Sequence, residues 1–295
     1  MKSNIRGSIY LLLCAFIWGM AFVAQSTATD YVGPFTFVFA RSLLTSVVLF
    51  IAYRIFTTQE ERTRILAMKK TYLVRGAIIG AILFSACSFQ QAGIAYTTTA
   101  KSGFITALYI VMIPIIGVLF MKKRIGRLVW IGVVVALVGM CLLCLKDDLS
   151  INIGDLLTLI CALLFSLHVI SVDELCGALN SILISAIQFA TCTLIALPIM
   201  LIAEKPALGN ILACWTSIAY AGICSGAIAY TLQIVGQKYA EPTLASLLMC
   251  LESVFAALGG WVLLGQALSL REFIGCALML SASVIAQLPD RQLSH

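Results

Sequence analysis

Two charged side chains, Arg41 and Glu252, stand inside long apolar segments of the sequence. A charge within a membrane-spanning helix costs at least about 2.5–3.5 kcal/mol on insertion scales, so it normally faces a cavity or a partner. A carboxylate in such a place can carry a proton or hold an ammonium group, and a guanidinium can hold a carboxylate. Together Arg41 and Glu252 are expected to bracket a zwitterion. The alternative is that they pair with each other, or with nearby hydroxyls and carbonyls, and only hold helices together.

Polar and aromatic residues at similar depths complete the expected substrate-binding set. At least one of the adjacent Gln90 and Gln91 must point inward, and the indole of Trp18 can wall a cavity or stack on a cation. These candidates are Trp18, Gln90, Gln91, Tyr109 and Ser225. Glu252 and His168 are the candidates for a coupling proton. For His168 the alternative is a neutral, hydrogen-bonded histidine between helices.

The composition indicates a polytopic membrane protein. The 295 residues are 61% hydrophobic and only 11% charged, with a mean hydropathy of +1.05, whereas soluble domains carry about 25% charged residues. The net charge of +6 is spread between apolar runs, which argues against nucleic-acid binding. Eleven cysteines, an odd number and mostly inside apolar segments, predict neither a disulfide framework nor a metal site.

Ten apolar segments approach the roughly 20 residues that cross a bilayer. They lie near residues 5–27, 34–53, 76–95, 102–121, 128–145, 155–172, 181–203, 213–236, 243–264 and 272–288. With the N-terminus inside, fourteen of the Lys and Arg residues fall on the cytoplasmic side and four on the outer side. This bias places both termini in the cytoplasm of a multi-pass protein of the cell membrane, whether inner or plasma membrane.

The ten segments divide into two sets of five. Five is odd, so a second copy must enter the membrane from the opposite side, as in transporters with inverted repeats. Residues 7–18 align with 154–165, with Gly, Cys and Ala at three matched positions and Trp18 opposite Phe165. The third and eighth segments each carry two glycines four residues apart, at 76 and 80 and at 222 and 226, which permit close helix contact. We expect an all-α fold of ten transmembrane helices, with inverted repeats at 1–148 and 149–295.

Several short motifs resemble EamA-type members of the drug/metabolite transporter (DMT) superfamily. They are TAKSGFITALYIVMIP at 99–114, LESVFAALGGWVLLGQ at 251–266, the pair Trp18-Gly19, and Arg41 seven residues after Pro34. The resemblance covers the whole chain. It implies a ten-helix, two-repeat carrier that works by alternating access and exports amino acids or other small metabolites.

The chain departs from that pattern at two places. The family often has Glu-Pro where this chain has Glu252-Ser253, and Gly-Glu where it has Gly265-Gln266. Without the proline, we expect the ninth helix to be straighter and to keep its backbone hydrogen bonds.

The expected function is secondary-active transport of small metabolites, with export or exchange of amino acids or related amphiphilic compounds first. A carrier of organic cations such as quaternary amines is the alternative, and a membrane sensor or scaffold is a more distant one. The sequence has no Gly-rich phosphate loop, no histidine pair at metal spacing and no G-x-S-x-G motif, so we expect neither an enzyme nor a cofactor. The expected partners are the substrate, membrane lipid and a coupling proton, with the protein a monomer or a homodimer.

Overall fold

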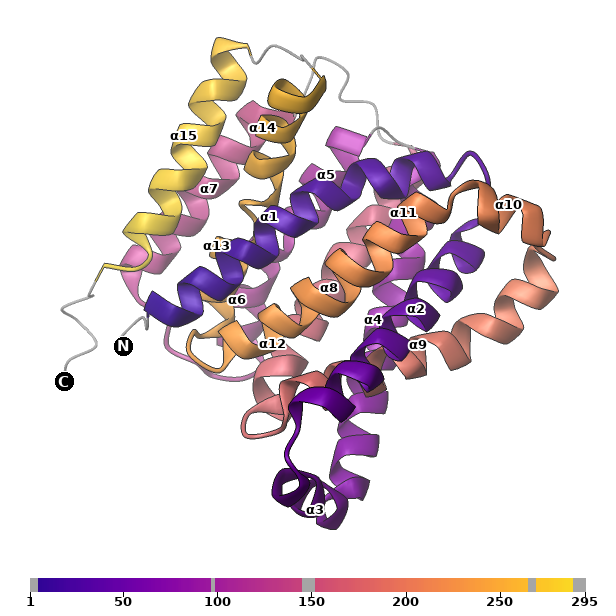
Figure 1. Cartoon of the computed structure of the whole chain (residues 1–295). Coiled ribbons are helices and arrows are strands. Elements are labelled where there is room, and N and C mark those ends of the chain that lie inside the picture. Colours follow the sequence, from indigo (N-terminus) through magenta and orange to yellow (C-terminus); the bar gives the residue numbers. More distant parts are fainter. Residues whose placement is uncertain (1–4, 97–98, 145–151, 265–268, 289–295) are drawn as a thin grey trace.

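The computed structural model describes residues 5–96, 99–144, 152–264 and 269–288, and every element in that part of the chain is a helix (Figure 1). The first half contains α1 (Ile5–Ala28), α2 (Pro34–Phe56), α3 (Gln59–Ala67), α4 (Lys69–Ile94), α5 (Thr99–Ala107), α6 (Tyr109–Leu119) and α7 (Arg127–Cys144). The second half contains α8 (Ile153–Cys176), α9 (Ser181–Ala203), α10 (Leu208–Ala213), α11 (Trp215–Ala219), the π-helix η1 (Tyr220–Ala229), α12 (Tyr230–Gln237), α13 (Pro242–Met249), α14 (Glu252–Leu264) and α15 (Leu270–Ile285).

Seven helical stretches among the described residues are long and apolar enough to cross a membrane. They are Ile5–Ala28, Pro34–Phe56, Lys69–Ile94, Ser102–Leu119, Ile153–Cys176, Ser181–Ala203 and Trp215–Gln237. The stretches Arg127–Leu143 and Pro242–Leu258 are apolar but shorter. Many large apolar side chains, such as Ile51, Val134 and Leu194, are exposed on the outer surface of the bundle, as lipid contact requires. The chain is therefore a multi-pass membrane protein.

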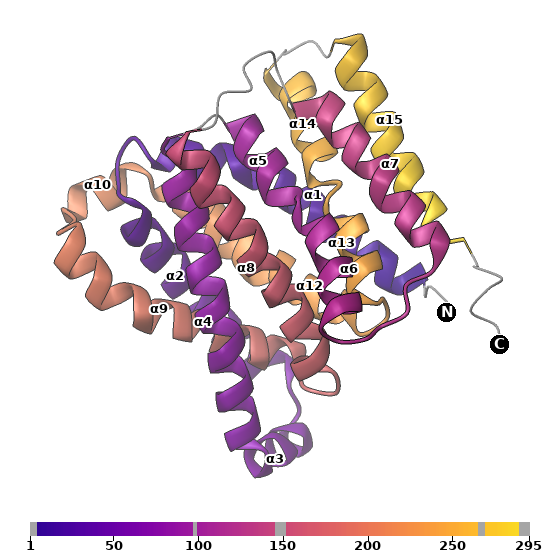
Figure 2. The ribbon, with the colours of Figure 1, turned by 180° about the vertical axis from the view of Figure 1, so that it is seen from behind.

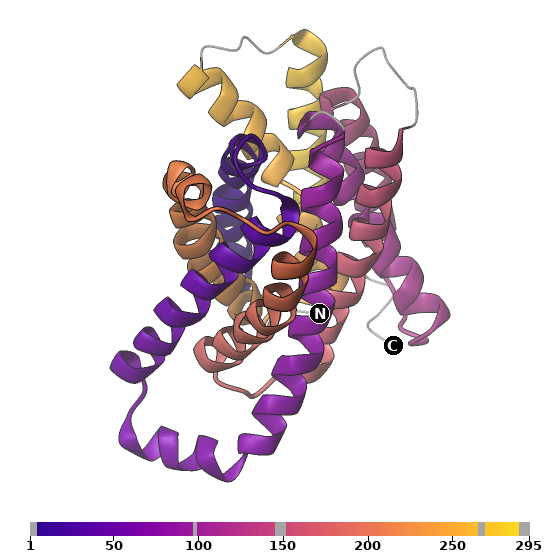
Figure 3. The ribbon, with the colours of Figure 1, turned by 90° about the vertical axis from the view of Figure 1, so that its right-hand side faces the viewer.

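The two ends of the described chain lie at the same end of the bundle. The Ser8 hydroxyl at the start of α1 donates a hydrogen bond to Gln287 Oε1, just after α15, over 3.0 Å. The short helix α3 projects beyond the other helices at the lower end in Figures 1 and 3. The boundary expected between residues 148 and 149, and the pair Gly265-Gln266, lie outside the described residues.

Helices of the two halves make equivalent contacts. Helix α1 packs against η1, α12, α13 and α14, and its counterpart α8 packs against α4, α5 and α6. In the same way α2 contacts η1, α9 contacts α4, and α2 and α9 contact each other. Helices α7 and α15 run side by side at one edge in Figures 1 and 2. Each half therefore completes the other rather than forming a separate bundle.

Glycines at two matched places permit close approach of these helices. A Cβ on Gly7 would lie 3.1 Å from the Gly236 carbonyl oxygen, and a Cβ on Gly154 would lie 2.8 Å from the Gly93 carbonyl oxygen. Gly7 and Gly154 are the residues that the sequence alignment superposes. They therefore occupy corresponding contacts, one between α1 and α12 and the other between α8 and α4.

The glycine pairs of the third and eighth segments also lie at helix contacts, as predicted. A Cβ on Gly80 of α4 would approach the Gln188 carbonyl oxygen of α9 to 2.5 Å. A Cβ on Gly226 of η1 would collide with the Thr45 hydroxyl of α2. That hydroxyl donates to the Gly222 carbonyl over 2.7 Å, so a polar contact also holds η1 against α2.

The ninth apolar segment is interrupted, and the expectation of a straight helix with intact bonds is wrong. Leu251 N–H bonds to Leu248 O over 3.4 Å and Ser253 N–H bonds to Cys250 O over 3.2 Å, so each donates to the residue three positions back instead of four. A helix can tighten in this way without a proline. The fourth segment has the same feature at Leu108, between α5 and α6.

The start of α2, which carries Arg41, is fixed by a carboxylate from the other half. Glu204, just after α9, accepts hydrogen bonds from the backbone N–H groups of Phe35 and Thr36 over 2.8 and 2.7 Å and from the Thr36 hydroxyl over 2.6 Å. These N–H groups have no partner inside the helix, and the positive end of the helix dipole favours an anion there. The contact holds α2 and α9 together at one end.

Candidate functional site

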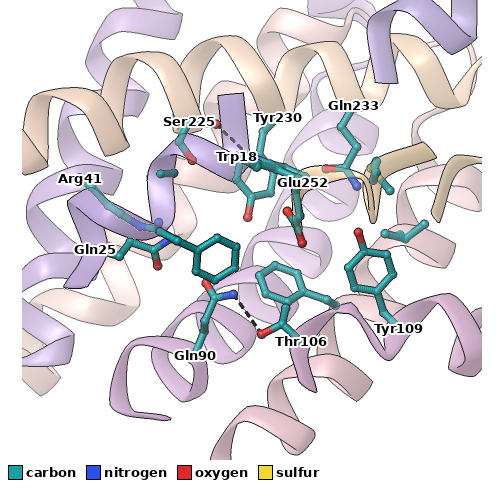
Figure 4. Close-up of a pocket in the computed structure, with 15 residues that line it drawn as sticks. Trp18, Gln25, Arg41, Gln90, Thr106, Tyr109, Ser225, Tyr230, Gln233 and Glu252 are labelled. Carbon is teal, nitrogen blue, oxygen red and sulfur yellow. Dashed lines mark hydrogen bonds between the residues drawn. The ribbon is translucent and has the colours of Figure 1, made fainter. Parts of the chain in front are cut away.

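A cavity lies between the two halves, at the level where the fourth and ninth segments are interrupted (Figure 4). The space between its lining side chains is about 520 Å³, part of it open to the exterior. Its lining side chains come from α1, α2, α4, α5 and α6 of the first half and from α8, η1, α12, α13 and α14 of the second. A concave space with aromatic and apolar walls and a few polar groups is the usual form of a small-molecule pocket.

Six of the residues expected from sequence line this cavity, and two do not. The six are Trp18, Arg41, Gln90, Tyr109, Ser225 and Glu252. Gln91 instead donates through Nε2 to the Gln25 carbonyl over 3.2 Å. His168 is fully buried behind the cavity wall, where its Nε2 lies 3.1 Å from Gln188 Oε1. The geometry of His168 matches the hydrogen-bonded alternative that its sequence position left open.

Glu252 is the first residue of α14, directly after the interruption of the ninth segment. Its side chain is only 5% exposed, and no described residue forms a hydrogen bond or ion pair with its carboxylate. Gly19 of α1 lies against the backbone of Glu252, since a Cβ there would be 2.5 Å from the Glu252 carbonyl oxygen. The interruption and this close contact together aim an unpaired carboxylate into the cavity.

Arg41 lies at the opposite end of the cavity from Tyr109 (Figure 4). Its Nη2 donates to Cys87 Sγ over 2.7 Å, and its guanidinium carbon lies 5.9 Å from the centre of the Phe37 ring. Its Nε has no hydrogen-bond partner among the described residues. The ion pair with Glu252 that the sequence left open is not formed there. A buried guanidinium with spare donors can receive an anion.

Trp18 and Ser225 join α1 to the π-helix. The indole Nε1 donates to the Ser225 carbonyl over 3.4 Å, and the Trp18 ring lies 4.8 Å from that of Tyr230. A π-helix is wider than an α-helix and is often found at functional sites. Here η1 presents both a backbone carbonyl and a serine side chain at the cavity.

Four polar lining residues were missed from the sequence: Gln25, Thr106, Tyr230 and Gln233. Gln90 Nε2 donates to the Thr106 hydroxyl over 3.4 Å. Tyr230 stands at the centre of an aromatic group, with Phe189 at 5.2 Å and His168 at 6.0 Å between ring centres. An amide side chain inside an apolar segment was the feature that identified Gln90 as a candidate. Gln25 and Gln233 have the same feature and could have been predicted in the same way.

The described residues hold no group of three or more His, Cys, Asp and Glu side chains placed to bind a metal ion. The polar groups that line the cavity are one carboxylate, one guanidinium, three amides and several hydroxyls. Such groups bind and orient a small polar molecule. Aromatic rings form much of the remaining wall.

Two known proteins similar to this chain are named as transporters. An uncharacterized transporter of Archaeoglobus fulgidus is 29% identical over 287 residues, covering 97% of this chain and 87% of that protein. The uncharacterized transporter YwfM of Bacillus subtilis is 27% identical over 302 residues, covering 99% and 97%. A solved crystal structure with 19% identity superposes with a TM-score of 0.81 over 99% of this chain and all of the other, which shows the same fold. The model of the EamA-like transporter family matches twice, at residues 5–145 and 152–287, and the chain therefore belongs to that family.

Proposed function

We propose that the protein is a secondary-active carrier that exports or exchanges small zwitterionic amines, amino acids first, by alternating access. The observation that carries this proposal is that Arg41 and Glu252 line one cavity between the two halves without pairing with each other. Each is a costly charge to bury. Each would gain a partner from a substrate that carries both an ammonium and a carboxylate.

Figure 4 supports the direction in which such a substrate would bind. Arg41 stands at one end of the cavity, while Glu252 and Tyr109 stand toward the other. The carboxylate of the solute would meet Arg41 and its ammonium would meet Glu252. The rings of Trp18 and Tyr230 would cover the apolar part between them.

The proposed architecture is ten crossings in two inverted repeats of residues 1–148 and 149–295. Both described ends lie on the same side of the bundle, which favours an even number of crossings and supports spanning by helices beyond the seven long ones. The equivalent contacts of α1 and α8, and the two separate family matches, support a duplicated unit. Helices α7, α13–α14 and α15 supply the remaining crossings.

Both ends of the chain are expected to face the cytoplasm of the cell membrane, because the basic residues favour that side. A protease-cleavable tag at either terminus should resist cleavage in intact spheroplasts and be cut after lysis. A tag in the loop between α9 and α10, near Lys205, should show the opposite behaviour. Cleavage of the C-terminal tag from outside would exclude the ten-crossing arrangement.

The cytoplasmic end of the cavity is the closed one in our proposal. There Lys123, in the loop after α6, bonds to Asp173 at 3.2 Å and Glu174 at 2.8 Å, at the end of α8. Partial burial lowers the pKa of Lys123, but the two carboxylates raise it more, so its pKa stands above the usual value. Arg75 of α4 donates to the Leu175 carbonyl over 2.9 Å. These bonds join the first half to the second and would have to open for release on that side.

The first test is the melting temperature of purified protein across amino acids, nucleobases, sugars and quaternary amines. A ligand that binds only the folded state raises it by mass action. Stabilisation by zwitterionic amino acids should be lost in both Arg41→Ala and Glu252→Gln. Arg54→Ala, which changes an exposed arginine in the last turn of α2, is the matched control and should respond like the parent protein.

The same measurement separates the rival functions. A carrier of quaternary amines would depend on Glu252 and be indifferent to Arg41→Ala. A sensor or scaffold would bind solute without saturable uptake into liposomes that contain the protein. A carrier, unlike an enzyme, should release the solute chemically unchanged, which mass spectrometry of the recovered solute checks.

A further inference from the structure

Three oxygen-bearing side chains from three helices point toward one another at the end of the cavity away from Arg41 (Figure 4). Glu252 begins α14, Tyr109 begins α6, and Gln233 lies in the last helix of the eighth segment, α12. Tyr109 and Glu252 each follow directly on an interruption of their segment. The fold thus brings three acceptors together from places far apart in the sequence.

All three acceptors lack a hydrogen-bond partner in the described part of the chain. Tyr109 Oη and Gln233 Oε1 are buried without one, in side chains that are 4% and 1% exposed. The Glu252 carboxylate likewise bonds to no described residue. Buried polar atoms in native proteins are nearly always hydrogen-bonded, so such a cluster indicates a position that a ligand or water fills.

We infer that Glu252, Gln233 and Tyr109 form a subsite for a primary ammonium group, which selects amines by their number of N–H bonds. This inference rests on the proposed function and names the chemistry of one end of the substrate. A primary ammonium has three N–H donors and no acceptor. The Glu252 carboxylate, the Gln233 amide oxygen and the Tyr109 hydroxyl would each accept one of these N–H bonds.

The subsite should discriminate against N-methylated amines although they carry the same charge. Each methyl group removes one N–H and leaves one buried oxygen unpaired, a loss worth roughly a tenfold change in affinity. A quaternary ammonium has no N–H and leaves all three oxygens unpaired. The nearby rings of Trp18 and Tyr230 attract any of these cations, so they add affinity without adding this discrimination.

The test uses butylammonium and its N-methyl, N,N-dimethyl and N,N,N-trimethyl derivatives as probes. Dissociation constants come from titrating the melting temperature of the full-length protein in lipid nanodiscs. We expect the affinity to fall about tenfold with each methyl group. A trimethyl derivative that binds as tightly as butylammonium would overturn the inference, and so would the absence of binding by all four.

Two variants tie the preference to the named oxygens. Tyr109→Phe removes only the hydroxyl and Gln233→Leu only the amide, so each should weaken butylammonium about tenfold and the trimethyl derivative hardly at all. Thr231→Val and Ser253→Ala are the matched controls, because each removes a hydroxyl that has no partner among the described residues and changes no side chain that lines the cavity. They should keep the parent order of affinities. Equal weakening of all four probes in Tyr109→Phe and Gln233→Leu would contradict the subsite.

A comparison of sodium chloride with choline chloride distinguishes an ammonium site from a site for an alkali cation. If sodium chloride stabilised the protein more than choline chloride at equal ionic strength, and Gln233→Leu removed that difference, the oxygens would hold a metal cation and the inference would be wrong. The proposed function fails by a different readout, the absence of amino-acid uptake into liposomes. Uptake with no sensitivity to N-methylation would overturn the subsite alone.

Discussion

Glu252→Gln is expected to abolish accumulation of substrate driven by a pH gradient while leaving exchange of the solute across the membrane. A carboxylate can hold either a proton or an ammonium, and this competition couples the two fluxes. The amide in the variant cannot be protonated, so the solute would follow only its own gradient. Loss of the charged acceptor should also weaken binding roughly 10- to 100-fold, so exchange must be measured at saturating solute. The measurement is counterflow and pH-jump uptake in proteoliposomes.

Glu241→Gln provides the control for that experiment. Glu241 directly precedes α13, just before the ninth apolar segment; it is exposed and makes no capping hydrogen bond with its side chain. Its replacement should leave both modes of transport intact. Retention of the parent pH dependence in Glu252→Gln would remove the coupling role from Glu252. His168, hydrogen-bonded to Gln188 outside the cavity, would then be the next group to replace.

Much of the fold follows from the regular recurrence of apolar segments, because a bilayer permits few backbone conformations in a segment that crosses it. Backbone groups must be bonded within each segment, and helices do this locally. The helical positions and the contacts of the glycine pairs were therefore predictable. The interruption at residues 250 and 251 was not, because no proline or glycine marks it. Helix α1 packs against both helices of this segment, α13 and α14, and a single sequence does not reveal such contacts.

The residues of the candidate site that could be predicted from sequence are those whose charged side chains are costly to bury. Arg41 and Glu252 stand out because a charge in an apolar segment needs a reason, and both line the cavity. Gln91 shows the limit of that reasoning, since an amide can instead bond to the backbone of a neighbouring helix. Gln233 shows the reverse limit. It carries the same signal as Gln90, an amide inside an apolar segment, but only the placement of the helices shows that it lines the cavity.

The contact between Gly19 and Glu252 predicts the second large effect. In Gly19→Ala the new Cβ would stand 2.5 Å from the Glu252 carbonyl oxygen and 2.9 Å from the Ala256 nitrogen. Both are backbone atoms, which cannot move by a change of rotamer. Helix α14 must therefore move away from α1, and this shifts the Glu252 carboxylate. Overpacking of this kind costs about 1–3 kcal/mol of stability. We expect a lower melting temperature and at least about tenfold weaker substrate binding, since misplacement by about 1 Å is enough to disrupt a site.

Gly117→Ala isolates the steric cause, because it makes the same chemical change where there is room. A Cβ at Gly117, inside α6, would lie 3.9 Å from Ile125 Cδ1, an ordinary contact. Alanine is also favoured over glycine within a helix by roughly 0.5–1 kcal/mol, so Gly117→Ala should be neutral or stabilising and should bind substrate normally. Only Gly19→Ala should therefore lower the stability of the protein. If Gly19→Ala matched Gly117→Ala in both stability and affinity, close packing of α1 on α14 would not be what positions Glu252.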